Sequence, residues 1–298
     1  MIKTNFISLI LLLIAGIGYG SVFVANKLVA ENGFPTSAYL FWISFLGTLI
    51  TVLLFFFKKS NFNFSTINIL HFPVSATFGM LLPFAVVYFI ADKLPSGIIS
   101  ILFTLAPIFT YLFSYLLKVE PFRWMNLMAI FFGIIGVLMI TLPDASLPNK
   151  DSSNWILFGL IAPIAAAVNN IFVAKLRPPK TSTFIIVFGI LLSSSIITLP
   201  IMLSTEGAIM FWNYNIIVIV GVFWATLVHT VGFFCLYEVI KRAGPIFFSQ
   251  IAYIIIFTAL VWGYIFFGES HSPWAWAAIL LMIISLILAN YSAKKEPN

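Results

Sequence analysis

The chain has 298 residues, of which 62% are hydrophobic and only 8% are charged, and its mean hydropathy is +1.11. Soluble domains carry about 25% charged residues, so this composition excludes a soluble protein and indicates an integral membrane protein. The formal net charge of +6 comes from Lys and Arg in short loops, which favours a topology signal over a nucleic-acid site. The single cysteine, Cys235, excludes an internal disulfide and a cysteine-based metal cluster.

Apolar stretches follow one another along the whole chain, each near the ~20 residues with which a helix crosses a bilayer. They predict an all-α integral membrane protein with ten transmembrane helices. The first stretch is longer than the apolar core of a signal peptide, so we interpret it as a retained span. The loops are too short to hold a soluble module. The expected spans are residues 5–28, 36–57, 70–90, 96–117, 123–142, 155–175, 182–203, 214–237, 246–267 and 273–293.

Basic residues are distributed unevenly between the two sides of the expected bundle. With the N-terminus in the cytoplasm, twelve of the fifteen Lys and Arg residues fall on the inner side, and only Lys27, Lys93 and Lys150 fall on the outer side. Such a bias in short loops sets orientation by the positive-inside rule. We therefore expect a multi-pass protein of the cytoplasmic (inner) membrane with both termini cytoplasmic and the loop at 148–151 outside.

The sequence repeats itself at an offset of 149 residues, half of its length. Phe23-Val24-Ala25 aligns with Phe172-Val173-Ala174, and Glu120 aligns with Glu269. Because each half holds an odd number of spans, the second half must be inverted relative to the first. Many membrane transporters are built this way and bind substrate near the midplane. We expect two five-helix repeats in one compact bundle, residues 1–145 and residues 150–298.

Small residues in the first span predict a close helix contact. Gly16 and Gly20 lie on one helix face, and Ala162 and Ala166 have the same spacing in the sixth span. Such spacing lets two helix backbones approach closely in lipid. A nucleotide-binding loop would need a strand before the glycines, and apolar sequence stands there instead. We expect span 1 to cross span 6 through these residues.

Polar and aromatic side chains within the spans are the candidates for substrate binding. His229 lies about midway along the eighth span, where an ionisable group suggests a functional site. The alternative is a neutral imidazole bonded to a neighbouring helix. If His229 is protonated during transport, the rate should depend on pH between about 5 and 8. The candidate substrate-binding residues are Tyr19, Thr104, Asn169, Asn170, Trp224, His229, Gln250 and Tyr253.

The adjacent amides Asn169 and Asn170 point about 100° apart on a helix. We expect one of them to join helices and the other to line a cavity. Tyr88 and Tyr237 are equivalent in the repeat and are either paired gates or interfacial aromatics. His71 and His271 lie near span ends and are expected at the interface.

The acidic residues lie near span ends. Glu120 and Glu269 each follow a span and are expected to cap or order the start of the next helix. Glu238 is expected to pair at the surface with Lys241 or Arg242. No H-E-x-x-H motif is present, so we expect no metal site and no cofactor.

These patterns together resemble a known family. Tyr88, Leu94-Pro95-Ser96-Gly97, Ala106-Pro107, Glu120 and Gly133-Ile134-Ile135-Gly136 resemble an EamA-type half of the drug/metabolite transporter superfamily. The second copy, Tyr237, Ala243-Gly244-Pro245 and Glu269, is looser, and Ile256 replaces Pro107. The resemblance implies ten helices in two inverted repeats and alternating access. It also implies a central cavity walled by spans 1, 3, 4, 6, 8 and 9, with spans 5 and 10 at the periphery.

We therefore expect a secondary transporter that moves small organic metabolites, with export of amino acids or related zwitterionic or neutral solutes as the leading hypothesis. Unpaired buried charge is expensive, which favours such solutes. A multidrug, organic-cation or vitamin carrier of the same fold is the alternative. The family's small four-span drug exporters use a glutamate in span 1, and here no acid lies between Asn5 and Leu28.

An enzyme or a channel is less favoured, because neither a catalytic constellation nor a filter motif is visible. The expected partners are a small-molecule substrate and membrane lipid, and no nucleic acid. A monomer is one possible state, and no coupling ion is assigned.

Overall fold

The computed structural model describes residues 2–57, 66–103, 105–118, 124–141, 152–176, 178, 181–249, 251–270 and 272–293. Every regular element within these residues is helical. Seven segments are long and apolar enough to cross a membrane, and a shorter apolar helix covers Ile254–Phe267. The prediction of an all-helical, multi-pass membrane protein is thereby confirmed, whereas the total of ten spans remains a prediction.

The first half begins with α1 (Ile2–Glu31) and α2 (Thr36–Phe57). The expected third span consists of α3 (Thr66–Ala76), the π-helical turn η1 (Thr77–Leu81) and α4 (Leu82–Phe89) in succession. The Leu82 amide donates to the carbonyl of Thr77, five residues back. This wide turn comes directly before Pro83, which has no amide hydrogen to donate. The half ends with α5 (Ser96–Phe103), α6 (Ala106–Leu116) and α7 (Trp124–Thr141).

The second half contains α8 (Ser152–Gly159), α9 (Ile161–Leu176), α10 (Thr183–Thr205) and the 3-10 turn η3 (Phe211–Asn213). It continues with α11 (Ile216–Ser249), α12 (Ile251–Phe267) and α13 (Pro273–Ala293). The residues between the expected spans 214–237 and 246–267 are helical, because α11 continues without a break to Ser249. The ion pair between Glu238 and Arg242, 3.0 Å long and one helical turn apart, favours helix at this point. It also confirms the expected surface pairing of Glu238.

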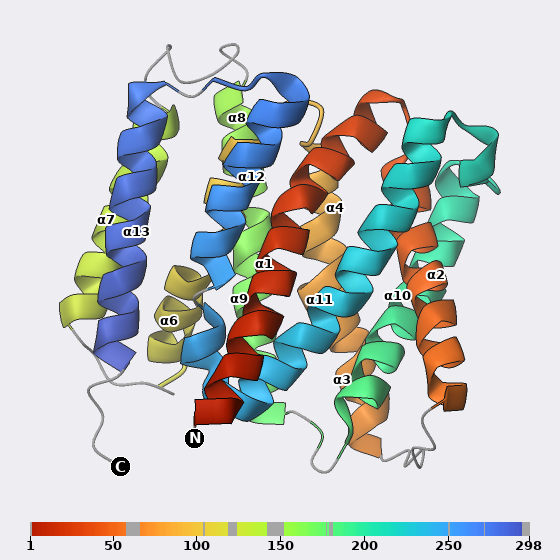
Figure 1. Cartoon of the computed structure of the whole chain (residues 1–298), viewed down its shortest axis with the longest axis horizontal. Coiled ribbons are helices and arrows are strands. Elements are labelled where there is room, and N and C mark those ends of the chain that lie inside the picture. Colours follow the sequence, from red (N-terminus) through yellow and green to blue (C-terminus); the bar gives the residue numbers. More distant parts are fainter. Residues whose placement is uncertain are drawn as a thin grey trace.

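The helices pack in a specific set of pairs (Figure 1). α7 lies beside α13 at one end of the bundle, and α2 lies beside α10 at the other. Between these pairs, α1 packs against α11 and α12, and α9 packs against α6, η1 and α4. α1 begins and α13 ends at the same, lower end of the view.

The predicted crossing of span 1 with span 6 is wrong in its partner. A Cβ atom built on Gly16 would lie 2.6 Å from Cγ2 of Ile254 on α12. The Oγ1 of Thr258, also on α12, donates to the Gly16 carbonyl at 3.2 Å. The small residues of α1 do form a close helix contact, but they form it with α12 and not with α9. Spacing along one helix predicts a close approach, and it carries no information about which helix approaches.

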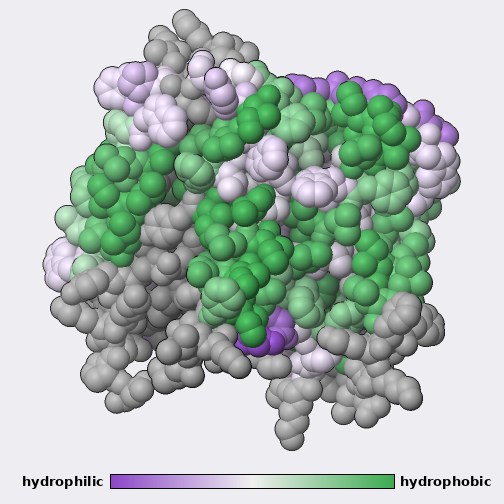
Figure 2. Space-filling view, viewed as in Figure 1, coloured by the Kyte–Doolittle hydropathy of each residue, from purple (hydrophilic) through white to green (hydrophobic). Residues whose placement is uncertain are grey.

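The outer surface is that of a protein surrounded by lipid. Hydrophobic side chains form a broad band across the middle of the molecule, and hydrophilic residues gather at its upper edge (Figure 2). Large apolar residues along α1, including Phe6, Ile10, Leu13 and Ile17, are exposed. Apolar exposure of this extent in a helix bundle indicates contact with acyl chains.

Candidate functional site

His229 lies against aromatic rings from α1 and α4, and we call Tyr19, Phe84, Phe103 and His229 the central cluster. The imidazole centroid is 4.2 Å from that of Phe84 on α4 and 5.8 Å from that of Tyr19 on α1. Phe84 also stacks on Phe103 of α5, with 6.3 Å between ring centroids. The cluster therefore joins α1, α4, α5 and α11 at one point in the bundle.

His229 is fully buried, and neither of its ring nitrogens has a hydrogen-bond partner. The alternative of an imidazole bonded to a neighbouring helix therefore finds no support among the described residues. A buried polar group without a partner is costly, and a neutral imidazole offers one donor and one acceptor. Both ring nitrogens of His229 thus remain unbonded in this arrangement of helices.

Tyr19 approaches this position because Gly232 on α11 has no side chain. A Cβ atom at Gly232 would lie 2.6 Å from the Tyr19 hydroxyl oxygen. The neighbouring Thr230 hydroxyl is also buried without a partner. The α1–α11 contact therefore places Tyr19 beside the unbonded imidazole, whereas the Thr230 hydroxyl faces α2, where a Cβ atom on Gly47 would lie 2.8 Å from its oxygen.

The two adjacent amides of α9 have different surroundings. Asn170 is exposed, and its Nδ2 donates to Oγ1 of Thr110 on α6 at 3.2 Å. Asn169 is half-buried against η1, where a Cβ atom on Gly79 would lie 2.6 Å from its Nδ2. The Oδ1 of Asn169 is buried without a partner. Asn170 thus joins two helices, while Asn169 retains an unbonded acceptor beside a π-helical turn, a feature that is frequent at functional sites.

The other candidates do not join the central cluster. Trp224 is 45% exposed, and its Nε1 donates to Oγ of Ser21 at 2.9 Å, which links α11 to α1. Thr104 and Gln250 lie outside the described residues, and Tyr253 is described only as part of the α12 backbone.

The expected interfacial position of His71 is wrong, and the interfacial alternative for Tyr88 and Tyr237 finds no support, so their role as paired gates stays a prediction. Tyr88 and Tyr237 are each only 2% exposed, and His71 is 1% exposed. Tyr88 stacks on Tyr39 at 4.0 Å and donates to the Phe34 carbonyl at 2.7 Å. Neighbouring helices cover these positions, and depth along a span does not indicate whether a residue faces lipid or another helix. His271 lies outside the described residues.

A second polar group lies beyond the end of α12, and we call Lys27, Ser96, Gly97 and Glu269 the Glu269 cluster. The Glu269 Oε1 accepts from Lys27 Nζ and from the Ser96 amide, both at 2.9 Å. Its Oε2 accepts from Ser96 Oγ at 3.0 Å and from the Gly97 amide at 3.4 Å. Glu269 therefore does cap a helix, but it caps α5 from the first half rather than the next helix, α13.

Burial alone would raise the pKa of the Glu269 carboxyl. The hydrogen bonds from Lys27 and Ser96 and the charge of Lys27 outweigh burial and hold this pKa below its ordinary value. Sequence reasoning used Lys27 only as a topology signal. One feature of the sequence could have identified the pair: Lys27 lies within the last residues of an apolar span, and the chain has few acidic residues that could neutralise it.

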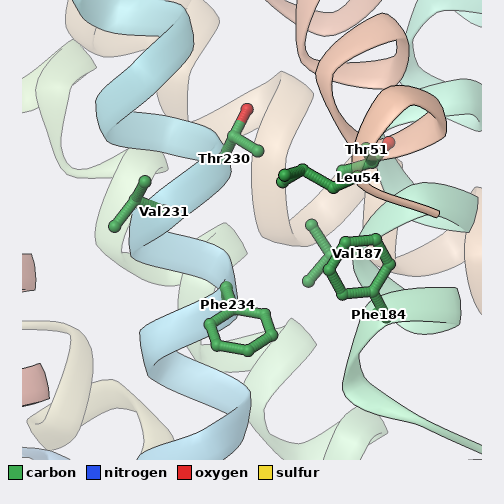
Figure 3. Close-up of a pocket in the computed structure, with 7 residues that line it drawn as sticks. All are labelled: Thr51, Leu54, Phe184, Val187, Thr230, Val231 and Phe234. Atoms are coloured by element: carbon green, nitrogen blue, oxygen red, sulfur yellow. The ribbon is translucent and has the colours of Figure 1, made fainter. Parts of the chain in front are cut away.

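An apolar pocket of about 370 Å³ lies between α2, α10 and α11 (Figure 3). Among its described lining residues, two threonine hydroxyls are the only polar side-chain groups, and none of the predicted site residues is present. Its lining residues are Thr51, Leu54, Phe184, Val187, Thr230, Val231 and Phe234. Among the residues that the structure describes, no group of three or more His, Cys, Asp or Glu side chains could hold a metal ion.

Comparison with known proteins identifies several similar chains. Protein PecM of Dickeya dadantii is 24% identical over 213 residues, which cover 69% of this chain and 68% of that protein. An uncharacterized transporter of Clostridium kluyveri is 22% identical over 300 residues, covering 97% and 94% of the two chains. A protein of known crystal structure shares the fold with a TM-score of 0.65 at 12% identity, over 97% of this chain and 98% of that one.

The EamA-like transporter family matches this sequence twice, over residues 6–142 and over residues 153–291. The two matches together cover most of the chain, and each falls within one half of it. The chain therefore belongs to the EamA-like transporter family and is a membrane transporter of small solutes rather than an enzyme.

Proposed function

We propose that the chain is a secondary transporter that moves small organic metabolites across the cytoplasmic membrane by alternating access. Its ten helices form two inverted five-helix repeats, residues 1–145 and residues 150–298. Amino acids or related zwitterionic or neutral solutes are the proposed substrates, and export is the proposed direction.

The observation that carries this proposal is the pattern of helix pairs. Helices that align with each other at the repeat offset of 149 residues are counterparts. By this offset α9 aligns with α1, and α6 aligns with α12. The segment formed by η1 and α4 aligns with part of α11. α1 packs on α11 and α12, and α9 packs on α4, η1 and α6. At the two ends of the bundle, α2 packs on its counterpart α10, and α7 packs on its counterpart α13. A two-fold axis in the membrane plane would generate this exchange of partners, as in other inverted-repeat carriers.

The position of the central cluster supports alternating access. Tyr19, Phe84 and Phe103 come from the first repeat, and His229 comes from the second. A rocking motion of one repeat against the other would therefore change the surroundings of the unbonded imidazole. A solute bound there would contact both repeats, as binding at a repeat interface requires.

The polar groups favour uncharged or zwitterionic solutes. His229, Thr230 and Asn169 each present a buried polar atom without a partner. The buried charges of the Glu269 cluster, in contrast, are paired with each other. A multidrug or organic-cation carrier would be expected to place an unpaired acidic side chain near its binding site. In α1 no acidic residue lies between Phe6 and Leu28, the part of the span whose side chains are described.

The charge distribution supports a cytoplasmic position of both termini. α1 begins and α13 ends at one end of the bundle, and the sequence predicts most of the Lys and Arg residues on that side. By the positive-inside rule, this distribution favours that end as the cytoplasmic one.

Counterflow in proteoliposomes tests the proposal. Purified protein is first screened for thermal stabilisation by amino acids, nucleosides, amines and vitamins, and each stabilising solute is then tested for counterflow. His229→Ala should abolish most of the counterflow. Leu227→Ala serves as the matched control, because Leu227 lies two residues away on α11 and is 48% exposed. Absence of saturable counterflow for every stabilising solute would refute the carrier function.

A further inference from the structure

We propose that the Glu269 cluster is a latch on the outer end of the transporter, which must release Glu269 from Lys27 and from the start of α5 before that end can open. The inference rests on the proposed alternating access. It adds a named set of residues that controls one of the two openings.

The cluster connects the two halves of the chain by charge. Lys27 and Ser96 belong to the first half, and Glu269 belongs to the second. The other two ion pairs among the described residues, Asp92–Lys93 and Glu238–Arg242, each lie within one half. Separation of the halves at this end therefore breaks the Lys27–Glu269 pair and leaves those two pairs intact.

The backbone around Glu269 is shaped to hold the carboxylate in this position. A Cβ atom on Gly263 of α12 would lie 2.5 Å from Glu269 Oε2 and 2.7 Å from Ser96 Oγ. Gly268 has φ of 61°, a conformation that favours glycine. The chain then turns so that the Glu269 amide donates to the Gly263 carbonyl at 3.3 Å. Lys27 Nζ also lies 4.3 Å from the ring centroid of Phe267. The loop thus holds the Glu269 carboxylate against Lys27 and the N-terminus of α5.

The bonds of the cluster are suited to reversible opening. The side chains of Lys27 and Glu269 are 14% and 7% exposed, so the pair lies at the edge of the protein interior. Both charges can be hydrated once the halves separate, because Glu269 lies beyond the end of the apolar helix Ile254–Phe267. When the outer end opens, the negative carboxylate also loses its favourable contact with the amides at the α5 N-terminus. This loss costs free energy, so the contact favours the closed state.

A thiol reporter below the cluster can measure the opening. Ser100 is fully buried one turn beyond Ser96 on α5. The reporter protein carries Ser100→Cys together with Cys235→Ala, which removes the native thiol. A membrane-impermeant maleimide is added to intact cells, and the labelling rate reports how often the outer end opens.

We expect Lys27→Met and Glu269→Gln each to raise the labelling rate about tenfold, which corresponds to about 1.4 kcal/mol. Asp92→Asn is the matched control, because it breaks an ion pair that lies within one half and keeps the contact of Lys93 with the Trp155 ring, and it should leave the rate unchanged. Labelling of Lys27→Met and Glu269→Gln at the control rate would overturn the proposal. If both of these variants fail size-exclusion chromatography, Ser96→Ala decides the matter. It removes one hydrogen bond and keeps the ion pair, so faster labelling supports the latch and an unchanged rate overturns it.

The reporter needs no substrate, so it separates this proposal from the transport function. Counterflow by the parent protein with unchanged labelling of the variants would refute the latch alone. Faster labelling of the variants without counterflow of any solute would refute the proposed carrier function and would still support the Glu269 cluster as a latch.

Discussion

The contact between α1 and α12 has no room for a side chain at Gly20. A Cβ atom at this position would contact Thr258 Oγ1, and it would lie 2.9 Å from Thr258 Cβ and 3.0 Å from the backbone nitrogen of Ala259. Thr258 Oγ1 is also held by the Ile254 carbonyl at 2.6 Å. Because a backbone nitrogen cannot rotate away, Gly20→Ala must move the two helices apart.

Overpacking of a well-packed contact lowers the free energy of unfolding by about 1–3 kcal/mol. Gly18→Ala is the matched control, since the nearest atoms that a Cβ there would meet belong to the Val228 side chain, the first of them at 3.1 Å. Alanine favours helix over glycine by about 0.8–1.0 kcal/mol, and this gain is common to both substitutions. We therefore expect Gly20→Ala to be less stable than Gly18→Ala by about 1–3 kcal/mol.

Thermal melting of the purified variants measures the difference, and Thr258→Ala in the Gly20→Ala background should restore part of the loss. Gly20→Leu, with its larger side chain, should also block counterflow in liposomes even when the protein inserts and remains monodisperse. A Gly20→Ala protein that melts at or above Gly18→Ala would refute the α1–α12 contact. Parental counterflow by Gly20→Leu would refute its role in transport.

Three further predictions follow from the charge distribution, the central cluster and the Glu269 cluster. Reporters fused after Lys59 and at Asn298 should be cytoplasmic and one at 148–151 external, and a cytoplasmic result at 148–151 would remove the inverted repeat. His229→Ala should lower transport strongly while the yield of folded protein stays nearly unchanged, and parental transport would assign His229 to packing. The lowered pKa of Glu269 favours the carboxylate in the folded state, so its contribution to stability is complete above the ordinary value of 4.5 and is lost as pH falls through the folded pKa. Below that value the melting temperature of the parent should fall more steeply than that of Glu269→Gln, and parallel curves would contradict the cluster's role.

The sequence predicted those properties that depend on one helix at a time. The expected span at 36–57 coincides with α2, because a bilayer requires a fixed length of apolar helix. The position of His229 midway along its span followed from the same count, and the structure places it against the rings of Tyr19 on α1 and Phe84 on α4. The segment between the expected spans 214–237 and 246–267 is helical in the structure, because a drop in hydropathy marks the end of an apolar span and not the end of a helix.

The identity of neighbouring helices and the burial of each face were decided only by the tertiary structure. Lipid chains are as apolar as a protein interior, so a membrane helix carries apolar residues on both its buried and its exposed faces. For this reason the sequence could not show that Gly16 and Gly20 face α12, or that Tyr88, Tyr237 and His71 are covered by other helices. The same limit applies to Lys27 and Glu269, which are 242 residues apart in the chain and 2.9 Å apart in the fold. Composition and periodicity determined a helical membrane protein of two similar halves, and packing between those halves determined which polar side chains are bonded and which are left available.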